Sequence, residues 1–132
     1  MAITKNTALR NLQAQALGDA FDGGTIQIRT GAKPASANSA ASGSLLSTIN
    51  LPDPAFAPAA SGAIDKAGTS WSAIASGTGT AGYARFISSD TLKVMDCTVA
   101  ESAADLIIDD DAITSGGIVT VTAMTLNIPS GE

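Results

Sequence analysis

The chain has 132 residues, a length that suits one domain with its own hydrophobic core. Its net charge is −5, and its seven lysines and arginines are scattered along the sequence. Binding to nucleic acid or to an anionic membrane surface depends on clustered cations, so we expect neither partner. The single cysteine, Cys97, excludes an intrachain disulfide. No apolar run approaches the ~20 residues that span a bilayer, and the first residues lack the apolar region of a secretory signal.

The first predicted element is a helix over residues 7–22, with Thr7 as its N-cap. Gly23 and Gly24 end it, because glycine accepts the left-handed conformation that closes a helix C-terminus. A helix this short is marginal alone in water, so its apolar face is expected to dock on the domain. Helical spacing predicts which side chains form that face: Leu9, Leu12, Ala16 and Ala20, flanked by Leu17 and Phe21.

Beyond the glycines the apolar period changes from helical to two, which predicts β-strands. Strands are expected at residues 25–30 and 44–51, separated by a long flexible loop of small residues over 31–43. The Pro-rich stretch that follows cannot be a central strand, and Phe56 is expected to anchor it to the core. Two further short strands are expected at residues 63–66 and 70–76.

The second half predicts a hairpin and a long final strand. Residues 81–88 and 91–99 form the hairpin, whereas residues 103–111 fit either a short strand or a turn of helix. Residues 118–128 are partly apolar on both faces, which indicates a central strand or one covered by a neighbouring subunit. Residues 1–132 are therefore expected to form a single mainly-β domain: an antiparallel β-sandwich or partly closed barrel with one N-terminal helix. No β-α-β alternation is present, so parallel pairing is not expected.

The sequence offers few groups for catalysis or metal binding. Histidine is absent, which removes the commonest general base at neutral pH and the imidazole ligands of most zinc and copper sites. Cys97 lies in an apolar strand pattern and is interpreted as structural. Asp109, Asp110 and Asp111 form an acidic cluster, either a solvated turn or a weak candidate for a cation site. We therefore predict no enzyme activity, no catalytic residue, no cofactor and no small-molecule substrate.

Two other patterns bear on ligand binding. Gly77, Gly79 and Gly82 have the glycine spacing of a dinucleotide-binding loop, but a strand rather than a helix is expected to follow them, which argues against a phosphate site. The Ser/Thr-rich composition also fits a carbohydrate-binding or adhesion module. That alternative requires Trp71 or Tyr83 to be exposed, although both fit better as core or rim residues. A hydrolase would require two carboxylates that meet in one cleft.

Three segments together resemble small virion structural proteins of tailed bacteriophages and prophages: GGTIQIRTGAKPASANSAASGSLLSTINLPDPAF, GTAGYARFISSDTLKVMDCTV and SGGIVTVTAMTLNIPSGE. The resemblance implies a structural component with many copies in each particle, made in the bacterial host cytoplasm and located in the virion. It favours a capsid decoration (cement) protein, with a head–tail connector or tail structural protein as the alternative. The implied partners are major capsid or tail proteins and copies of the chain itself. No catalytic residues come with this resemblance.

Overall fold

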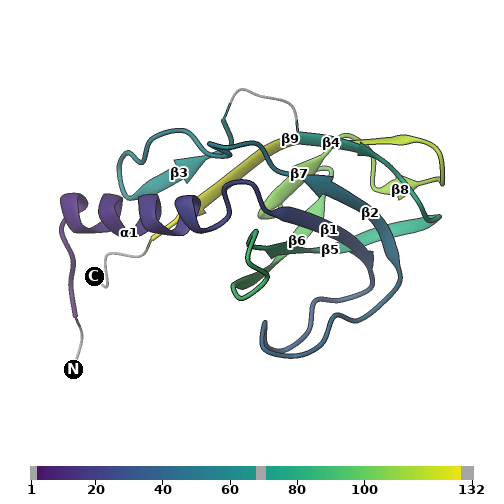
Figure 1. Cartoon of the computed structure of the whole chain (residues 1–132), viewed down its shortest axis with the longest axis horizontal. Helices are drawn as coiled ribbons and strands as arrows, with labels where there is room; N and C mark the ends of the chain where they lie inside the picture. Colours follow the sequence, from purple (N-terminus) through teal and green to yellow (C-terminus); the bar gives the residue numbers. More distant parts are fainter. Residues whose placement is uncertain (1–2, 68–70, 129–132) are drawn as a thin grey trace.

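The computed structural model describes residues 3–67 and 71–128, and within these ranges it has one helix and nine strands. Figure 1 shows the helix at one end of the long axis, with β3 beside it and most of the strands toward the other end. The described part of the chain has no helix that is both long and apolar enough to cross a membrane. In chain order the elements are α1 (Thr7–Ala20), β1 (Thr25–Thr30), β2 (Leu45–Asn50), β3 (Ala63–Asp65), β4 (Trp71–Ile74), β5 (Gly79–Ile87), β6 (Val94–Ala100), β7 (Leu106–Ile108), β8 (Ala112–Ile113) and β9 (Ile118–Asn127).

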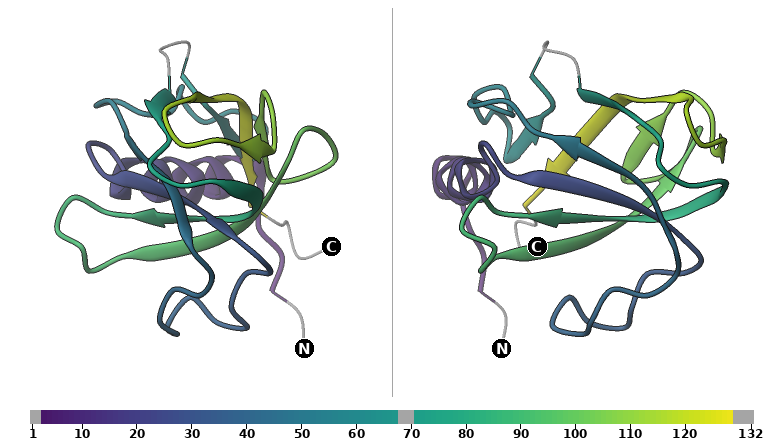
Figure 2. Two further views of the ribbon diagram at one scale, coloured as in Figure 1. Left: turned by 90° about the vertical axis from the view of Figure 1, so that its right-hand side faces the viewer. Right: turned by 45° about the vertical axis from the view of Figure 1, so that its right-hand side comes forward.

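The strands form one curled sheet in the order β2-β1-β5-β6-β7-β9-β3, with β4 paired to β9 and β8 paired to β5 (Figure 2). The curl brings β2 close to the segment that follows β4. There the backbone N–H groups of Ser76 and Gly77 donate to the Leu46 carbonyl at 2.8 and 3.1 Å. Leu46 lies at a register shift in the pairing of β2 with β1, where a bulge bends the strand. The fold is mainly β with one N-terminal helix, as predicted, and the sheet has the form of a half-barrel.

One strand pair departs from the expected antiparallel arrangement. β6 and β7 run parallel, with Val99 beside Leu106 and Ala100 beside Ile107. Parallel neighbours usually need a long crossover, which is why the absence of β-α-β alternation argued against them. Here the pairing is short, and the Asp105 side chain helps to hold the connecting loop by accepting hydrogen bonds from the N–H and hydroxyl of Thr98, both at 3.1 Å. The ambiguous segment 103–111 thus contains a strand rather than a turn of helix.

The ends of α1 differ slightly from the prediction. Asn6, rather than Thr7, is the N-cap, because its side-chain oxygen accepts a hydrogen bond from the N–H of Leu9 at 3.0 Å. The helix ends at Ala20, two residues before the predicted end at residue 22. Gly23 follows with a φ of 70°, which agrees with the expected glycine C-terminus.

The predicted docking face of α1 was partly wrong. Phe21 is buried, and Leu17 and Ala20 pack against the core, as predicted, but the other half of that face is exposed. Ala14 and Gly18 are the buried residues of the helix, whereas Leu9 and Leu12 are exposed. The reason is close packing: a Cβ atom on Gly18 would lie only 2.8 Å from Cδ1 of Ile64 in β3. The small residues therefore face the sheet because they let the helix backbone approach it, and Leu9 and Leu12 are left on the outside.

Four aromatic rings form the centre of the core. Phe56 and Phe86 each lie edge-to-face with Trp71, with ring centroids 5.2 and 6.3 Å apart, and Phe21 lies 5.7 Å from Phe86. The contacts join the end of the helix, the Pro-rich segment, β4 and β5. Phe56 is buried and anchors the Pro-rich segment, which confirms its predicted role.

The remaining strand predictions are confirmed, and in β9 the side chains that face the core change from one alternation to the other along the strand. β5 and β6 form the expected hairpin, and residue 70 of the predicted strand 70–76 lies outside the described residues. β9 is a central strand, paired with β7 on one edge and with β3 and β4 on the other. Its buried residues change parity, from Val119 and Val121 to Met124, because Thr122 is the extra residue of a bulge opposite β7.

Candidate functional site

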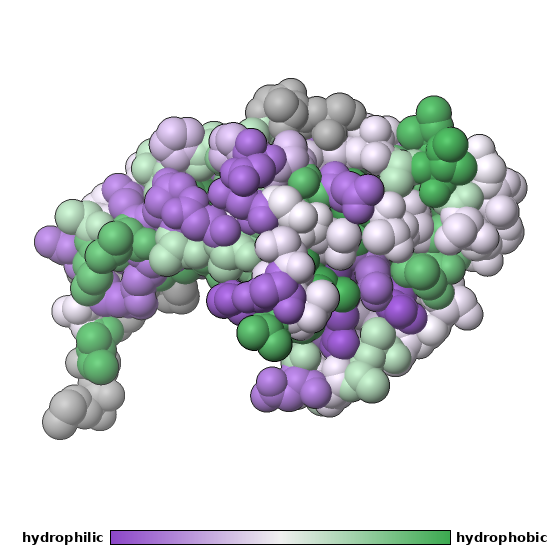
Figure 3. All heavy atoms as spheres, in the orientation of Figure 1, coloured by the Kyte–Doolittle hydropathy of each residue, from purple (hydrophilic) through white to green (hydrophobic). Residues whose placement is uncertain are grey.

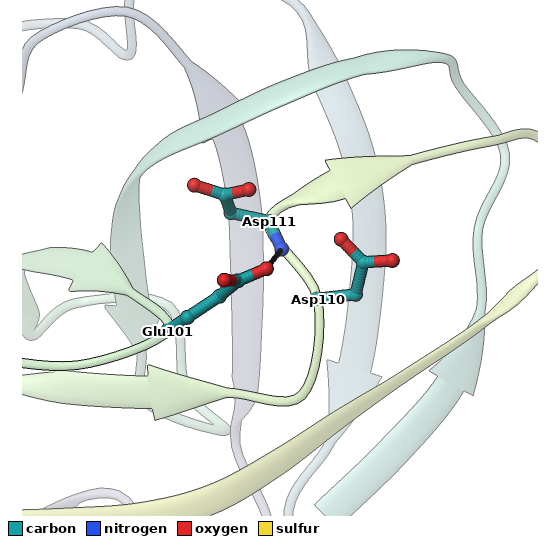
Figure 4. Close-up of side chains that lie close together, drawn as sticks. All are labelled: Glu101, Asp110 and Asp111. Atoms are coloured by element: carbon teal, nitrogen blue, oxygen red, sulfur yellow. Dashed lines mark hydrogen bonds between the residues drawn. The ribbon is translucent and has the colours of Figure 1, made fainter.

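Three carboxylates from two segments come together beside β8. Ligand atoms of Glu101, Asp110 and Asp111 all lie within 4.8 Å of one another (Figure 4). Glu101 follows β6 and accepts a hydrogen bond from the N–H of Asp111 at 3.3 Å. The Asp111 carbonyl accepts from the N–H of Ala81 at 2.9 Å, which ties the segment to β5. Asp110 accepts from the N–H of Ala112 at 2.9 Å.

This group differs from the predicted cluster Asp109, Asp110 and Asp111. Asp109 is directed elsewhere, because its Oδ1 accepts from the N–H groups of Asp110 and Thr120 at 3.0 and 3.2 Å. Glu101 takes its place in the cluster through the parallel β6–β7 connection, which the sequence pattern did not reveal. Three single oxygens are half or fewer of the six to eight that Ca²⁺ takes, so these carboxylates do not by themselves define a cation site.

An open hollow of about 210 Å³ lies next to the acidic group, and Asp109 and Asp110 line it together with Ile118. Ile118 pairs across the strands with Ile74, and both side chains are exposed. This end of the sheet therefore combines carboxylates with an apolar surface. We call it the acidic–apolar end, made up of Ile74, Glu101, Asp109, Asp110, Asp111 and Ile118.

Several other carboxylates have separate partners. Asp22 accepts a hydrogen bond from the N–H of Ala55 at 2.8 Å, and Asp65 accepts from the Thr125 hydroxyl at 2.6 Å. Asp96 pairs with Arg85. Among the described residues, Glu101, Asp110 and Asp111 are the one grouping of three potential metal-ligating side chains.

Arg85 and Asp96 form a buried ion pair across the β5–β6 hairpin. Nε and Nη2 of Arg85 donate to the two carboxylate oxygens of Asp96 at 2.7 and 2.9 Å. The Asp96 hydrogen bond raises the pKa of the guanidinium, and desolvation opposes this effect. Because the contact is bidentate, it matches Arg85 to Asp96 and supports one register of the hairpin. The apolar pattern of the sequence gives no signal for this pair.

Neither candidate aromatic forms an exposed sugar platform. Trp71 and Tyr83 both have 0% relative exposure. The Tyr83 hydroxyl donates to the Ser42 carbonyl at 2.8 Å and accepts from the Ser42 N–H at 2.9 Å, so it anchors the long loop 31–43. That loop contains no helix or strand, as predicted. The exposure that the carbohydrate-binding alternative required is not met.

The burial of Trp71 leads to a fluorescence prediction. As the only tryptophan, it is expected to emit at a short wavelength and to be poorly quenched by iodide until the protein unfolds. Trp71→Phe is expected to cost only about 1–2 kcal/mol, because Nε1 has no hydrogen-bond partner in the described part of the chain. Iodide quenching and urea unfolding test both statements. Strong quenching of the native protein, or a change in emission with a panel of glycans, would contradict them.

Two of the three glycines that resemble a nucleotide-binding loop are explained by close packing against backbone in the sheet. A Cβ atom on Gly77 would lie 2.6 Å from the Leu45 carbonyl oxygen, and one on Gly82 would lie 1.9 Å from the Gly31 carbonyl oxygen. Strand β5 begins at Gly79, so no helix N-terminus faces these residues. Gly77 and Gly82 are therefore explained by backbone contacts, and Gly79 is the first residue of a strand, so the three do not form a phosphate site.

Cys97 is buried in the core, and burial, together with Asp105 and Asp96, raises the pKa of its thiol from 9.0 to about 12. The native protein is therefore expected to react very slowly with Ellman's reagent at pH 8, and the unfolded protein rapidly. Since the folded state holds this proton more tightly, the resulting stability is complete below pH 9 and is lost as the pH rises toward 12. Cys97→Ala is expected to lack this part of the alkaline loss in urea titrations. An equal loss of stability with rising pH in the wild type and in Cys97→Ala would contradict the assignment of this loss to the Cys97 thiol.

Comparison of the chain with protein-family models, with curated proteins and with solved structures gives no match.

Proposed function

We propose that this protein is a non-enzymatic assembly subunit, which acts through the surfaces that it presents to other proteins. Within that class, we propose a capsid decoration (cement) protein of a tailed-bacteriophage particle, located in the virion. Its partners would be the major capsid protein and copies of itself. A head–tail connector or a tail structural protein is the alternative position in the same particle.

The observation that carries the proposal is the exposure of large apolar side chains at both ends of a small β domain. Leu9 and Leu12 are exposed on α1, and Ile74 and Ile118 are exposed on β4 and β9. Isolated apolar residues are normal on a protein surface, but paired ones on a chain of this size are typical of interaction sites. The resemblance to virion structural proteins supports the same class.

The test is to identify and count the chain in purified particles. Quantitative mass spectrometry should detect its peptides at a copy number comparable with that of the major capsid protein, and a particle reconstruction should place it on the outer capsid surface. A single ring of copies on the tail axis would favour the connector or tail position. Absence of its peptides from purified virions would refute the proposal.

A further inference from the structure

The N-terminal end of the molecule carries an exposed apolar surface with positive charge. We call it the helix surface and define it by Ile3, Lys5, Leu9 and Leu12. Leu9 and Leu12 lie one turn apart on α1, and Leu12 is 67% exposed. Residues 3–18 contain Lys5 and Arg10 and no carboxylate. The helix dipole places a partial positive charge at the N-terminus of α1, and no acidic residue in the first turn neutralises it.

The acidic–apolar end has the opposite charge. Ile74 and Ile118 are 69% and 70% exposed. Ile118 lines the open hollow together with Asp109 and Asp110, and Ile74 is its cross-strand partner on β4. Glu101 and Asp111 add two more carboxylates next to them. The last cation in the sequence is Lys93, so no lysine or arginine in residues 94–132 offsets this charge.

These two surfaces lie at opposite ends of the same molecule. Figure 3 shows hydrophobic side chains standing out near the helix at one end of the long axis, and again at the far end of the sheet. One surface combines leucines with cations, and the other combines isoleucines with carboxylates. Their chemistry is therefore complementary, although a single copy cannot bring them together.

We propose that the occupant of each surface is a second copy of this chain, with the helix surface of one copy docked on the acidic–apolar end of the next. Pairing of two acidic–apolar ends is disfavoured, because it would bring together eight carboxylates of like charge, four from each copy.

 In each copy, residues 101–111 carry five carboxylates, the four of the acidic–apolar end and Asp105. Two acidic–apolar ends therefore repel each other, whereas an acidic–apolar end and the helix surface attract each other. This inference rests on the proposed function, which makes copies of the chain its neighbours.

A contact of this kind is head-to-tail, and it leaves one surface free at each end of a dimer. Further copies can then add until a ring closes, or they can continue as a stack. The apolar centre of the contact would consist of Leu9 and Leu12 from one copy and Ile74 and Ile118 from the next. The charges around this centre would set the relative orientation of the two copies.

The test uses the full-length chain and two variants that each damage one surface. Sedimentation velocity of the wild type should show association that increases with concentration. Leu12→Asp and Ile118→Asp should each be monomeric when alone. An equimolar mixture of the two should form dimers and nothing larger, because one variant retains the helix surface and the other retains the acidic–apolar end. Leu9→Asp and Ile74→Asp repeat the test at the two surfaces.

Leu92→Asp is the matched control, since Leu92 is 81% exposed but lies in the β5–β6 turn, outside both surfaces. It should associate like the wild type, and circular dichroism should show that every variant is folded. A wild type that stays monomeric, or a mixture that forms no dimer, would overturn the inference. A monomer that is nevertheless abundant in purified particles would leave the proposed function standing, whereas a chain that associates but is absent from particles would refute only that function.

Discussion

Replacing Gly82 by alanine is expected to lower the free energy of unfolding by about 3 kcal/mol or more. Gly82 is the extra residue of a bulge in β5, between the partners of Arg29 and Thr30 in β1. An added Cβ would lie 1.9 Å from the Gly31 carbonyl oxygen, and the next nearest atoms are also backbone atoms of Gly31. The clash can be relieved only by moving one strand relative to the other. Urea unfolding followed by circular dichroism measures the loss.

Gly79→Ala is the matched control in the same stretch of sequence. Its Cβ would meet the ends of two side chains, Thr30 Cγ2 at 3.0 Å and Leu46 Cδ2 at 3.3 Å, which can shift by a few tenths of an ångström. We expect a change of less than about 1 kcal/mol. Similar losses for both variants would show that glycine is required along the whole stretch, and a stable Gly82→Ala protein would contradict the packing explanation.

The second large effect is expected at the buried Arg85–Asp96 pair. Asp96→Ala leaves the Arg85 guanidinium buried without a counter-charge, and should destabilise the protein by about 3–5 kcal/mol. Both side chains are almost fully buried, at 8% and 5% exposure, so solvent screens the interaction little. Replacing both partners, as Arg85→Met with Asp96→Leu, should recover most of the loss because no charge then remains buried. Urea unfolding of the wild type, the single variants and the double variant measures the coupling.

An exposed ion pair in the same hairpin provides the control. Lys93 and Asp90 are in contact at 3.1 Å, and their side chains are about half exposed. Lys93→Ala should therefore have a much smaller effect than Asp96→Ala, because water solvates the remaining carboxylate. If the double variant at Arg85 and Asp96 were as unstable as Asp96→Ala alone, unpaired charge would not be the cause of the loss.

The two ends of the molecule show why the candidate interaction surfaces were difficult to predict. Helical spacing correctly grouped Leu9 and Leu12 on one face of α1, but it assigned that face to the core. Which face is buried depends on how closely the helix can approach β3, and Gly18 decides this. At the other end, the final strand was predicted to be partly apolar on both faces, and the exposure of Ile118 beside Ile74 depends on the strand pairing.

The acidic group has a similar explanation. The run of aspartates at 109–111 was evident in the sequence, and Asp110 and Asp111 do belong to the group that the fold assembles. Glu101 joins them because β6 and β7 run parallel, an arrangement with no signal in the hydrophobic pattern. The bond of Asp109 to Thr120 depends in turn on how β9 lies against the segment that follows β7.

The sequence by itself determined the class of fold, the helix, the hairpin and the long final strand, because apolar periodicity and glycine or proline punctuation act over a few neighbouring residues. It also limited the chemistry, since a chain without histidine lacks the usual general base. Only the tertiary structure decided the buried face of α1, the Arg85–Asp96 pair and the grouping of Glu101 with Asp110 and Asp111. Each of these depends on contacts between residues that are distant in sequence, where packing distance and strand order override local pattern.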